Sequence, residues 1–115
     1  VYRASSAFLR DEVSGITSQM RRAAVSVVSN IAEGHERHSR GEFLQFLGHA
    51  RGSLAQLDTQ TRLATRLNLM TQAAATQLAE KIAEVGRMLN ALRKSLMSKD
   101  AARSDSSPQP PAPSP

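Results

Sequence analysis

The sequence contains no cysteine and no tryptophan, and aromatic residues make up only 3% of its 115 residues. Without cysteine there can be no disulfide, thiolate metal ligand or cysteine nucleophile, a composition compatible with a reducing cytoplasm. Because large rings are scarce, the core must be aliphatic and alanine-rich, which favours helix-on-helix packing over a β-sandwich. No apolar run approaches membrane-spanning length and no segment resembles a signal peptide, so we expect a soluble cytoplasmic protein without membrane association.

Acidic residues are also few: the sequence has 10 Asp and Glu against 15 Lys and Arg, which gives a net charge of +5. From Ser98 onward the basic and acidic residues cancel, so the positive excess lies in the rest of the chain. A basic helical surface suits an anionic partner, and nucleic acid is the first candidate. Solubility alone is the competing explanation for this charge.

Apolar residues recur every three or four positions in three segments, which predicts helices and no strand. The first helix is expected to begin near Arg10, after a turn within residues 1–8, and to end at Gly34 in a left-handed conformation. A Ser39–Glu42 capping box should start the second helix, and Thr71 should cap the third. The apolar positions are Val13, Ile16, Met20, Ala23, Val27 and Ile31; Phe43, Leu47, Ala50, Leu54, Leu57 and Ala64; and Ala75, Leu78, Ile82, Val85, Leu89, Leu92 and Leu96.

These patterns predict an all-α fold, an up-down antiparallel helical bundle in residues 1–97.

Two features interrupt the apolar pattern of the second helix. Thr61 falls on the apolar seam, and Gly52-Ser53 is expected to let a neighbouring backbone come close. Residues 98–115 are rich in Pro and Ser and lack apolar periodicity, so they are predicted to form a disordered tail.

The segment SNIAEGHERHSRGEF, residues 29–43, concentrates polar residues between two helices. His35 and His38 lack the His-Glu-x-x-His spacing of a zinc helix and have no nearby third ligand, so we expect no metal and no cofactor. Its serines show no triad spacing and the chain has no Gly-rich phosphate loop, so we expect no enzyme activity. We interpret the segment as a hydrogen-bonded clasp between helix ends, with ligand contact as the alternative; its residues are Asn30, Glu33, Gly34, Arg37, Ser39 and Glu42.

Cations in rows on the last two helices are the better binding candidates. Arg62 and Arg66 lie one turn apart, and Arg87 and Lys94 lie two turns apart with Arg93 adjacent. Because exposed aromatic positions are almost absent, binding is expected to be largely independent of nucleic-acid sequence. A protein-interaction scaffold, whose basic face docks an acidic partner, is the alternative function.

The chain resembles the four-helix-bundle proteins encoded in intervening sequences of bacterial 23S ribosomal RNA genes. The matching residues are Gln19, Arg21, Arg22, Ala23, Ser26, Asn30 to Gly34, Arg37, Ser39, Glu42, Phe43 and Gly52 to Leu54. The resemblance implies a homopentamer of four-helix bundles with a basic surface for RNA or DNA. The same fold in accessory proteins of diversity-generating retroelements implies a reverse transcriptase as a further partner.

The chain departs from that family in ways that affect stability. Most of the family's first helix is missing, and Leu9 and Val28 stand where relatives often have Pro. We therefore expect an uncovered groove and a chain that is molten or aggregates alone; a decayed copy without function is the limiting case. The expected lining is Met20, Val27, Leu47, Leu54 and Leu89.

Overall fold

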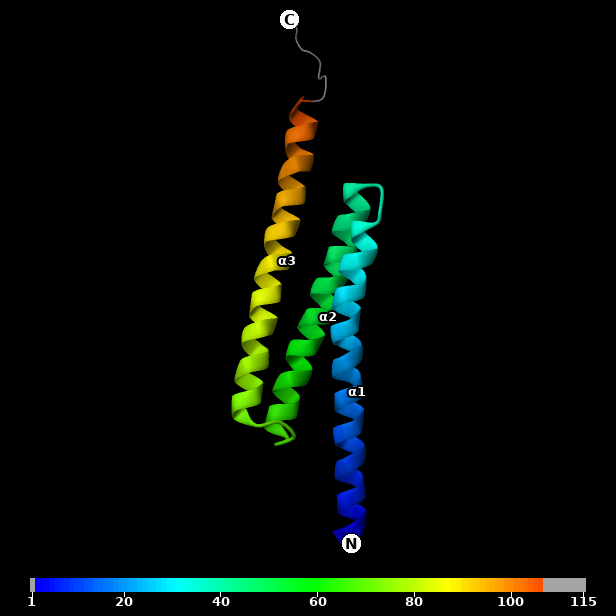
Figure 1. The fold of residues 1–115 in the computed structure, drawn as a ribbon, viewed down its shortest axis with the longest axis vertical. Coiled ribbons are helices and arrows are strands. Elements are labelled where there is room, and N and C mark those ends of the chain that lie inside the picture. The colour runs from blue at the N-terminus through cyan, green and yellow to red at the C-terminus, as the bar shows by residue number, and fades with distance from the viewer. Residues whose placement is uncertain (1, 107–115) are drawn as a thin grey trace, which may run out of the picture.

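The structure, a computed structural model, describes the backbone of residues 2–106 and the side chains of residues 10–11 and 14–98. It contains three long helices, α1 (Tyr2–His35), α2 (Arg40–Arg66) and α3 (Gln72–Ser106). Successive helices run in opposite directions (Figure 1). The predicted all-α class and the up-down order are therefore confirmed, and the described backbone contains no strand.

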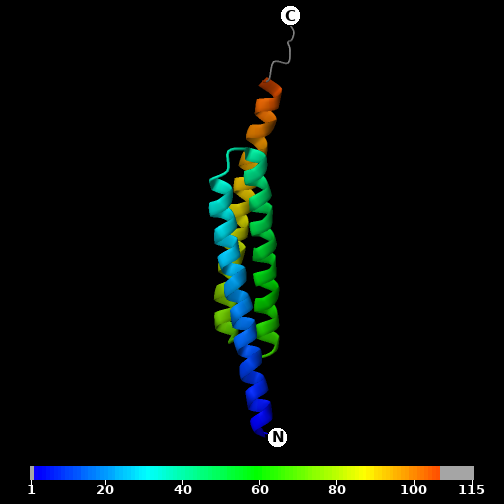
Figure 2. The same ribbon diagram turned by 90° about the vertical axis from the view of Figure 1, so that its right-hand side faces the viewer.

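Helix α2 is the centre of the bundle. It packs against both α1 and α3, whereas no Cα atom of α1 lies within 8 Å of one in α3 within residues 2–106. The chain is elongated, with principal extents of 83, 24 and 16 Å, and Figure 2 shows the ends of α1 and α3 projecting in opposite directions. The result is an elongated bundle in which α2 packs directly against both other helices.

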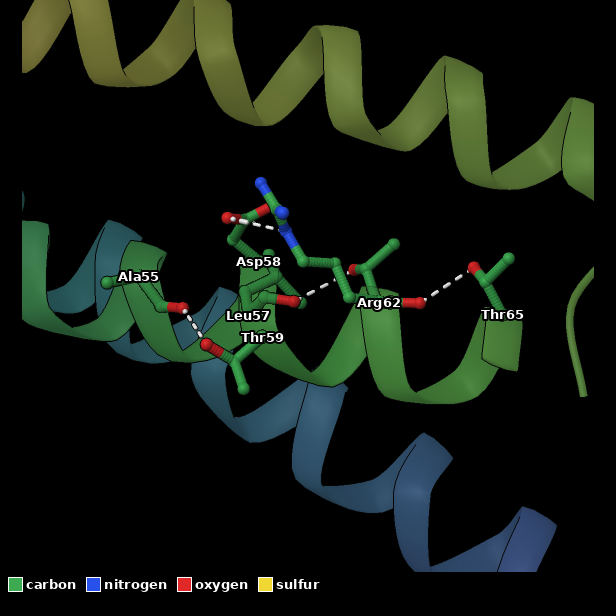
Figure 3. Close-up of polar contacts among 7 residues, drawn as sticks. Ala55, Leu57, Asp58, Thr59, Arg62 and Thr65 are labelled. Carbon is green, nitrogen blue, oxygen red and sulfur yellow. Dashed lines mark hydrogen bonds and ion pairs between the residues drawn. The ribbon is translucent and has the colours of Figure 1, made fainter. Parts of the chain in front are cut away.

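The core follows the predicted apolar positions on all three helices. The residues of its buried cluster are Ala23 and Val27; Leu47, Ala50, Leu54 and Leu57; and Ile82, Leu89 and Leu96. Thr61, the polar interruption of the α2 seam, is only 3% exposed. Its hydroxyl donates a hydrogen bond to the carbonyl of Leu57 at 2.8 Å, so its burial leaves no unpaired group (Figure 3).

The expected uncovered groove is wrong in its location. Of the five residues expected to line it, only Met20 is half-buried, and the other four belong to the buried cluster, in which Leu47 and Leu54 of α2 pack with Val27 of α1 and Leu89 of α3. Partly buried apolar side chains occur on all three helices, and those on α3 form a row, Leu78, Val85 and Leu92. This row lies beside the buried row of the same helix, from which it is three or four positions away at each step.

Helix α1 starts earlier than predicted. The helix is continuous from Tyr2, and the turn expected in residues 1–8 does not form within its described part. Residues 2–14 contain neither Gly nor Pro, and Leu9 occupies the position where the expected turn would need a helix breaker. Gly15 lies inside the helix without interrupting it, because a single helical Gly weakens a helix but does not end it.

Gly34 serves close packing and not the left-handed conformation predicted for it. No glycine with positive φ occurs in the described chain, and Gly34 is buried. A Cβ atom at this position would lie 2.8 Å from Cβ of Phe46 and 2.9 Å from Cδ1 of Phe43. At Gly52, where a close approach was predicted, a Cβ would meet no atom within 4 Å, so that prediction is wrong.

Both predicted N-cap residues act as caps, although only the Ser39 half of the Ser39–Glu42 capping box is found among the described residues, and α3 ends later than expected. The amide of Glu42 donates to Oγ of Ser39, and the amide of Ala74 donates to the hydroxyl of Thr71, each at 3.1 Å. Helix α3 continues to Ser106, so the first half of the predicted disordered tail is helical. Residues 98–106 contain no Gly or Pro, whereas Pro108 disfavours helix at the residue before it. The remainder of that tail, residues 107–115, lies outside the described residues.

Replacing Gly34 by alanine is expected to lower the free energy of unfolding by about 1–3 kcal/mol, because the new methyl group overlaps two phenylalanine side chains. The matched control is Gly48→Ala, since Gly48 is also helical and its Cβ would meet nothing within 4 Å. This control should gain up to about 1 kcal/mol from helix propensity. Urea unfolding followed by circular dichroism measures both, and equal effects would refute the packing role of Gly34.

Candidate nucleic-acid interface

A surface groove follows the seam between α2 and α3. It is formed by three hollows that join end to end, because the first two share Arg51 and Asn90 and the last two share Asp58. We call this feature the α2–α3 groove. Its lining is Arg51, Leu54, Ala55, Asp58, Thr61, Arg62, Thr65 and Arg66 from α2, and Gln72, Ala75, Thr76, Ala79, Glu80, Ile82, Ala83, Gly86, Asn90, Arg93, Lys94, Met97 and Ser98 from α3.

Small side chains on α3 create the groove. Ala75, Ala79, Ala83 and Gly86 recur every three or four positions, so they fall on one face of the helix. These residues do not fill the space beside α2, and a Cβ at Gly86 would only reach ordinary contact, 3.5 Å from Leu54. The groove therefore has an apolar floor of small residues, with charged side chains along its edges.

One end of the groove is basic. Arg51 from α2 and Arg93 and Lys94 from α3 line the same hollow, together with Asn90 and Ser98. None of the three cations forms an ion pair with another residue whose side chain the structure describes. The sequence explains this, because no Asp or Glu lies three or four positions from any of them, the spacing at which helical ion pairs form.

The other end of the groove carries mixed charge. Nε of Arg62 lies 3.3 Å from a carboxylate oxygen of Asp58, and both side chains lie on the side of α2 that faces α3 (Figure 3). Arg66 lines the same hollow and has no ion pair within the described part of the chain. Arg62 is thus partly neutralised, whereas Arg66 keeps its full charge.

The five predicted binding residues all lie on the α2–α3 hairpin but do not form one row. The structure places Arg93 and Lys94 at the basic end and Arg62 and Arg66 at the mixed end. Arg87 is exposed on α3, two turns before Lys94 and therefore on nearly the same helical face. The prediction grouped the cations by the helix that carries them, whereas in the fold they are grouped by their position along the α2–α3 groove.

Sequence reasoning missed two residues of α2, Arg51 at this interface and Gln60 on the side of the helix toward α1. Arg51 was not predicted because it has no cationic neighbour on its own helix, and only the register of the antiparallel hairpin brings it to Arg93. Gln60 is only 8% exposed, and its Oε1 accepts no hydrogen bond from the described residues. No pattern in the sequence distinguishes Gln60 from an exposed glutamine.

The predicted clasp separates into distinct interactions. Nδ2 of Asn30 donates to the carbonyl oxygen of Ser26 at 2.8 Å and to its Oγ at 3.1 Å. Oγ of Ser26 is hydrogen-bonded to Oγ of Ser53 at 2.7 Å, which links α1 to α2. Asn30 thus belongs to a serine network between the helices and does not join Glu33 and Arg37 as expected.

The remaining clasp residues act at the surface of the α1–α2 turn. Arg37 lies 3.3 Å from a carboxylate oxygen of Glu33, and its guanidinium carbon is 4.7 Å from the ring centre of Phe46. Glu42 contributes its amide to the Ser39 cap and is exposed. A single clasp is therefore wrong, because Asn30 is half-buried against α2 while Glu33 and Arg37 are on the solvent side.

The histidines of the turn have aromatic neighbours. The ring of His35 meets the edge of Phe43, and His49 stands in the same way to Phe46, each with ring centres 6.1 Å apart. Over the residues with described side chains, no three His, Asp or Glu residues gather as a metal site would require. Nor does any helix in the described range combine the length and apolarity needed to cross a bilayer.

The fold and the groove define a class of protein, an all-α antiparallel bundle with an α2–α3 groove that is basic at one end. The chain belongs to the 23S rRNA-intervening sequence protein family, whose family model matches residues 1–91. The match extends through α1, α2 and most of α3, and so includes Arg51 and Arg87 but not Arg93 or Lys94. Comparison with curated proteins found no match.

Replacing Asn30 by alanine is expected to destabilise the bundle by about 1 kcal/mol, because Ser26 Oγ loses its amide donor at the α1–α2 interface. Glu33→Ala should cost less, since exposed ion pairs contribute about 0–1 kcal/mol. Ser29→Ala, at an exposed neighbouring position, is the control and should stay within about 0.5 kcal/mol. Thermal and urea unfolding give the order, and a larger loss for Glu33→Ala than for Asn30→Ala would restore the clasp.

Proposed function

We propose that this chain is a non-enzymatic nucleic-acid-binding protein that contacts RNA or DNA through the α2–α3 hairpin. The observation that carries the proposal is the basic end of the groove, where Arg51, Arg93 and Lys94 meet without an ion pair to any described residue. Phosphate groups are the anions that such a surface suits best, because guanidinium groups bind them through two parallel hydrogen bonds. Since nucleic acid in bacteria lies in the cytoplasm, the proposal places the protein there.

Binding in this proposal is largely independent of base sequence. Base-specific recognition of single strands needs exposed rings on which bases stack. The described phenylalanines, Phe43 and Phe46, are instead half-buried at the α1–α2 turn, where they pack against Gly34. Contacts to the backbone would therefore supply the affinity, and such contacts carry no sequence information directly.

The protein acts as an oligomer in this proposal, with each unit completed to four helices. The half-buried row of Leu78, Val85 and Leu92 supports this, because these side chains are only partly buried and a further helix would cover them. The family resemblance implies a four-helix bundle and a homopentamer. Assembly in that form would repeat the net charge of +5 five times on one particle.

A protein-interaction scaffold is the second candidate function. It is favoured by the floor of the groove, where Ala75, Ala79 and Ala83 leave room for the apolar face of an amphipathic helix. An acidic helix would also suit the cations at the edges, and a reverse transcriptase is the partner class that the retroelement resemblance suggests. Capture of such a partner that survives nuclease treatment would favour the scaffold over nucleic-acid binding.

Replacing Arg62, Arg66, Arg87 and Lys94 with glutamine is expected to lower affinity for an RNA hairpin and a DNA duplex alike. Each phosphate contact contributes about −0.9 to the slope of log affinity against log salt on duplex DNA, so the slope should also flatten. Glutamine is a good helix former, so helix content should not change. Fluorescence anisotropy at several salt concentrations measures both quantities.

The control for this experiment removes the same charge elsewhere, by changing Arg10, Arg21, Arg22 and Lys81 to glutamine; all four are exposed and none lines the groove. Asp58→Asn provides a change of opposite sign, because it removes the carboxylate that neutralises Arg62 and should increase affinity. An affinity independent of salt, or equal losses in the two quadruple variants, would contradict a nucleic-acid interface on this hairpin.

An amphipathic helix fused before Val1 is expected to raise the melting temperature by several degrees, because it would cover the α3 row of Leu78, Val85 and Leu92. The control is the same fusion with polar residues at its apolar positions, which keeps length and charge but buries nothing. Differential scanning calorimetry compares the two. If the unfused chain already melts in one sharp transition and neither fusion shifts it, the four-helix proposal loses its support.

A further inference from the structure

The basic end of the α2–α3 groove holds three cations close together with no carboxylate lining the same hollow. Arg51 comes from α2, while Arg93 and Lys94 come from α3, so the charge is brought together by the packing of two helices. Placing like charges together opposes folding unless an anion offsets the repulsion. At the mixed end, Asp58 offsets the charge of Arg62, which makes the basic end the part of the groove without an internal counter-ion.

Arg93 is held differently from an ordinary surface arginine. Its side chain is half-buried, and its Nε is fully covered yet donates no hydrogen bond to any described residue. Buried donors are nearly always paired in folded proteins, so an unpaired one marks a guanidinium group whose charge the described part of the chain does not compensate. Because Nε is covered, the terminal nitrogens of the planar group are the donors left for a ligand.

The neutral residues of the hollow add to this arrangement. Asn90 and Ser98 lie along the same side of α3 as Lys94 and supply an amide and a hydroxyl that can donate to an oxyanion. The hollow has a volume of about 570 Å³. It is shallow and open to solvent, so a phosphate group can approach the three cations from outside.

We propose that Arg51, Arg93 and Lys94 form a phosphate seat, a site for one phosphate group of a nucleic-acid backbone at the end of the α2–α3 groove. Arg93 presents its guanidinium fork to the phosphate oxygens, Arg51 approaches from the opposite helix and Lys94 adds a point charge. This inference rests on the proposed function and deepens it, because it locates where a backbone phosphate is held. The seat requires both helices, so neither alone would bind with the same affinity.

Nuclear magnetic resonance of arginine side chains tests the seat on the full chain without nucleic acid. Inorganic phosphate is titrated at constant ionic strength while the Nε–Hε signals are followed. The Arg93 signal is expected to shift with saturation, and Arg51→Gln should weaken the apparent affinity several-fold. Lys81→Gln removes one charge from an exposed site on α3 away from the groove and should leave the affinity unchanged.

Arg93→Lys is the second variant, because it keeps the charge but lacks the planar fork, and it should also weaken phosphate binding. An Arg93 signal that does not respond to phosphate, or that responds equally in the Arg51→Gln and Lys81→Gln variants, would overturn the seat. Either result leaves the proposed function standing if RNA still binds elsewhere on the hairpin.

A parallel titration with a short single-stranded RNA separates the two proposals. Arg51→Gln and Arg93→Lys should both weaken RNA binding relative to Lys81→Gln. If phosphate shifts Arg93 while RNA does not bind at all, the seat stands as a site for free phosphate and the proposed function fails. If RNA binds and these two variants leave its affinity unchanged, the assignment of the seat to a backbone phosphate is overturned.

Discussion

The structure depends on a constraint on α2, which buries one face against α1 and another against α3, while the Cα atoms of α1 and α3 stay more than 8 Å apart within the described chain. Leu47 and Ala50 are fully inaccessible to solvent, and the hydroxyl groups that reach this interior find partners within their own helix or across the interface, whereas Oε1 of Gln60 has none among the described residues. Thr61 donates to the carbonyl of Leu57, and Ser53 bonds to Ser26. The same constraint leaves the outer sides of the two helix seams open, and one of these open sides is the α2–α3 groove.

Much of the fold could be predicted from the sequence, because periodic apolar positions and capping residues act locally. The alternating steps of three and four on α3 identified its buried row, and Ser39 and Thr71 marked two helix starts correctly. The errors in the predicted helix ends occurred where the outcome depended on whether a helix-breaking Gly or Pro was present. Residues 2–9 and 98–106 contain no Gly or Pro and remained helical. Gly34 leaves space for two phenylalanine side chains and does not adopt a left-handed conformation.

The candidate site was less predictable, since it depends on how two helices align. Cation rows on single helices are visible in the sequence, and Arg93 and Lys94 were found in this way. Arg51 is isolated on α2 and gains its neighbours only through the register of the hairpin. Asn30 was recognised as a polar residue needing partners, but its partner is Ser26, which was not among the predicted clasp residues and which in turn bonds the distant Ser53.

The Cα atoms of α1 and α3 stay more than 8 Å apart within residues 2–106, which also shapes how the protein opens. We expect each outer helix to detach with little disturbance of the other's interface, as in two hairpins that share α2. Local opening of α3 would leave the α1–α2 pair with its serine network and the Gly34 contact intact. Backbone amides of α2 should accordingly exchange with solvent last, and those of α3 should follow a separate, faster opening.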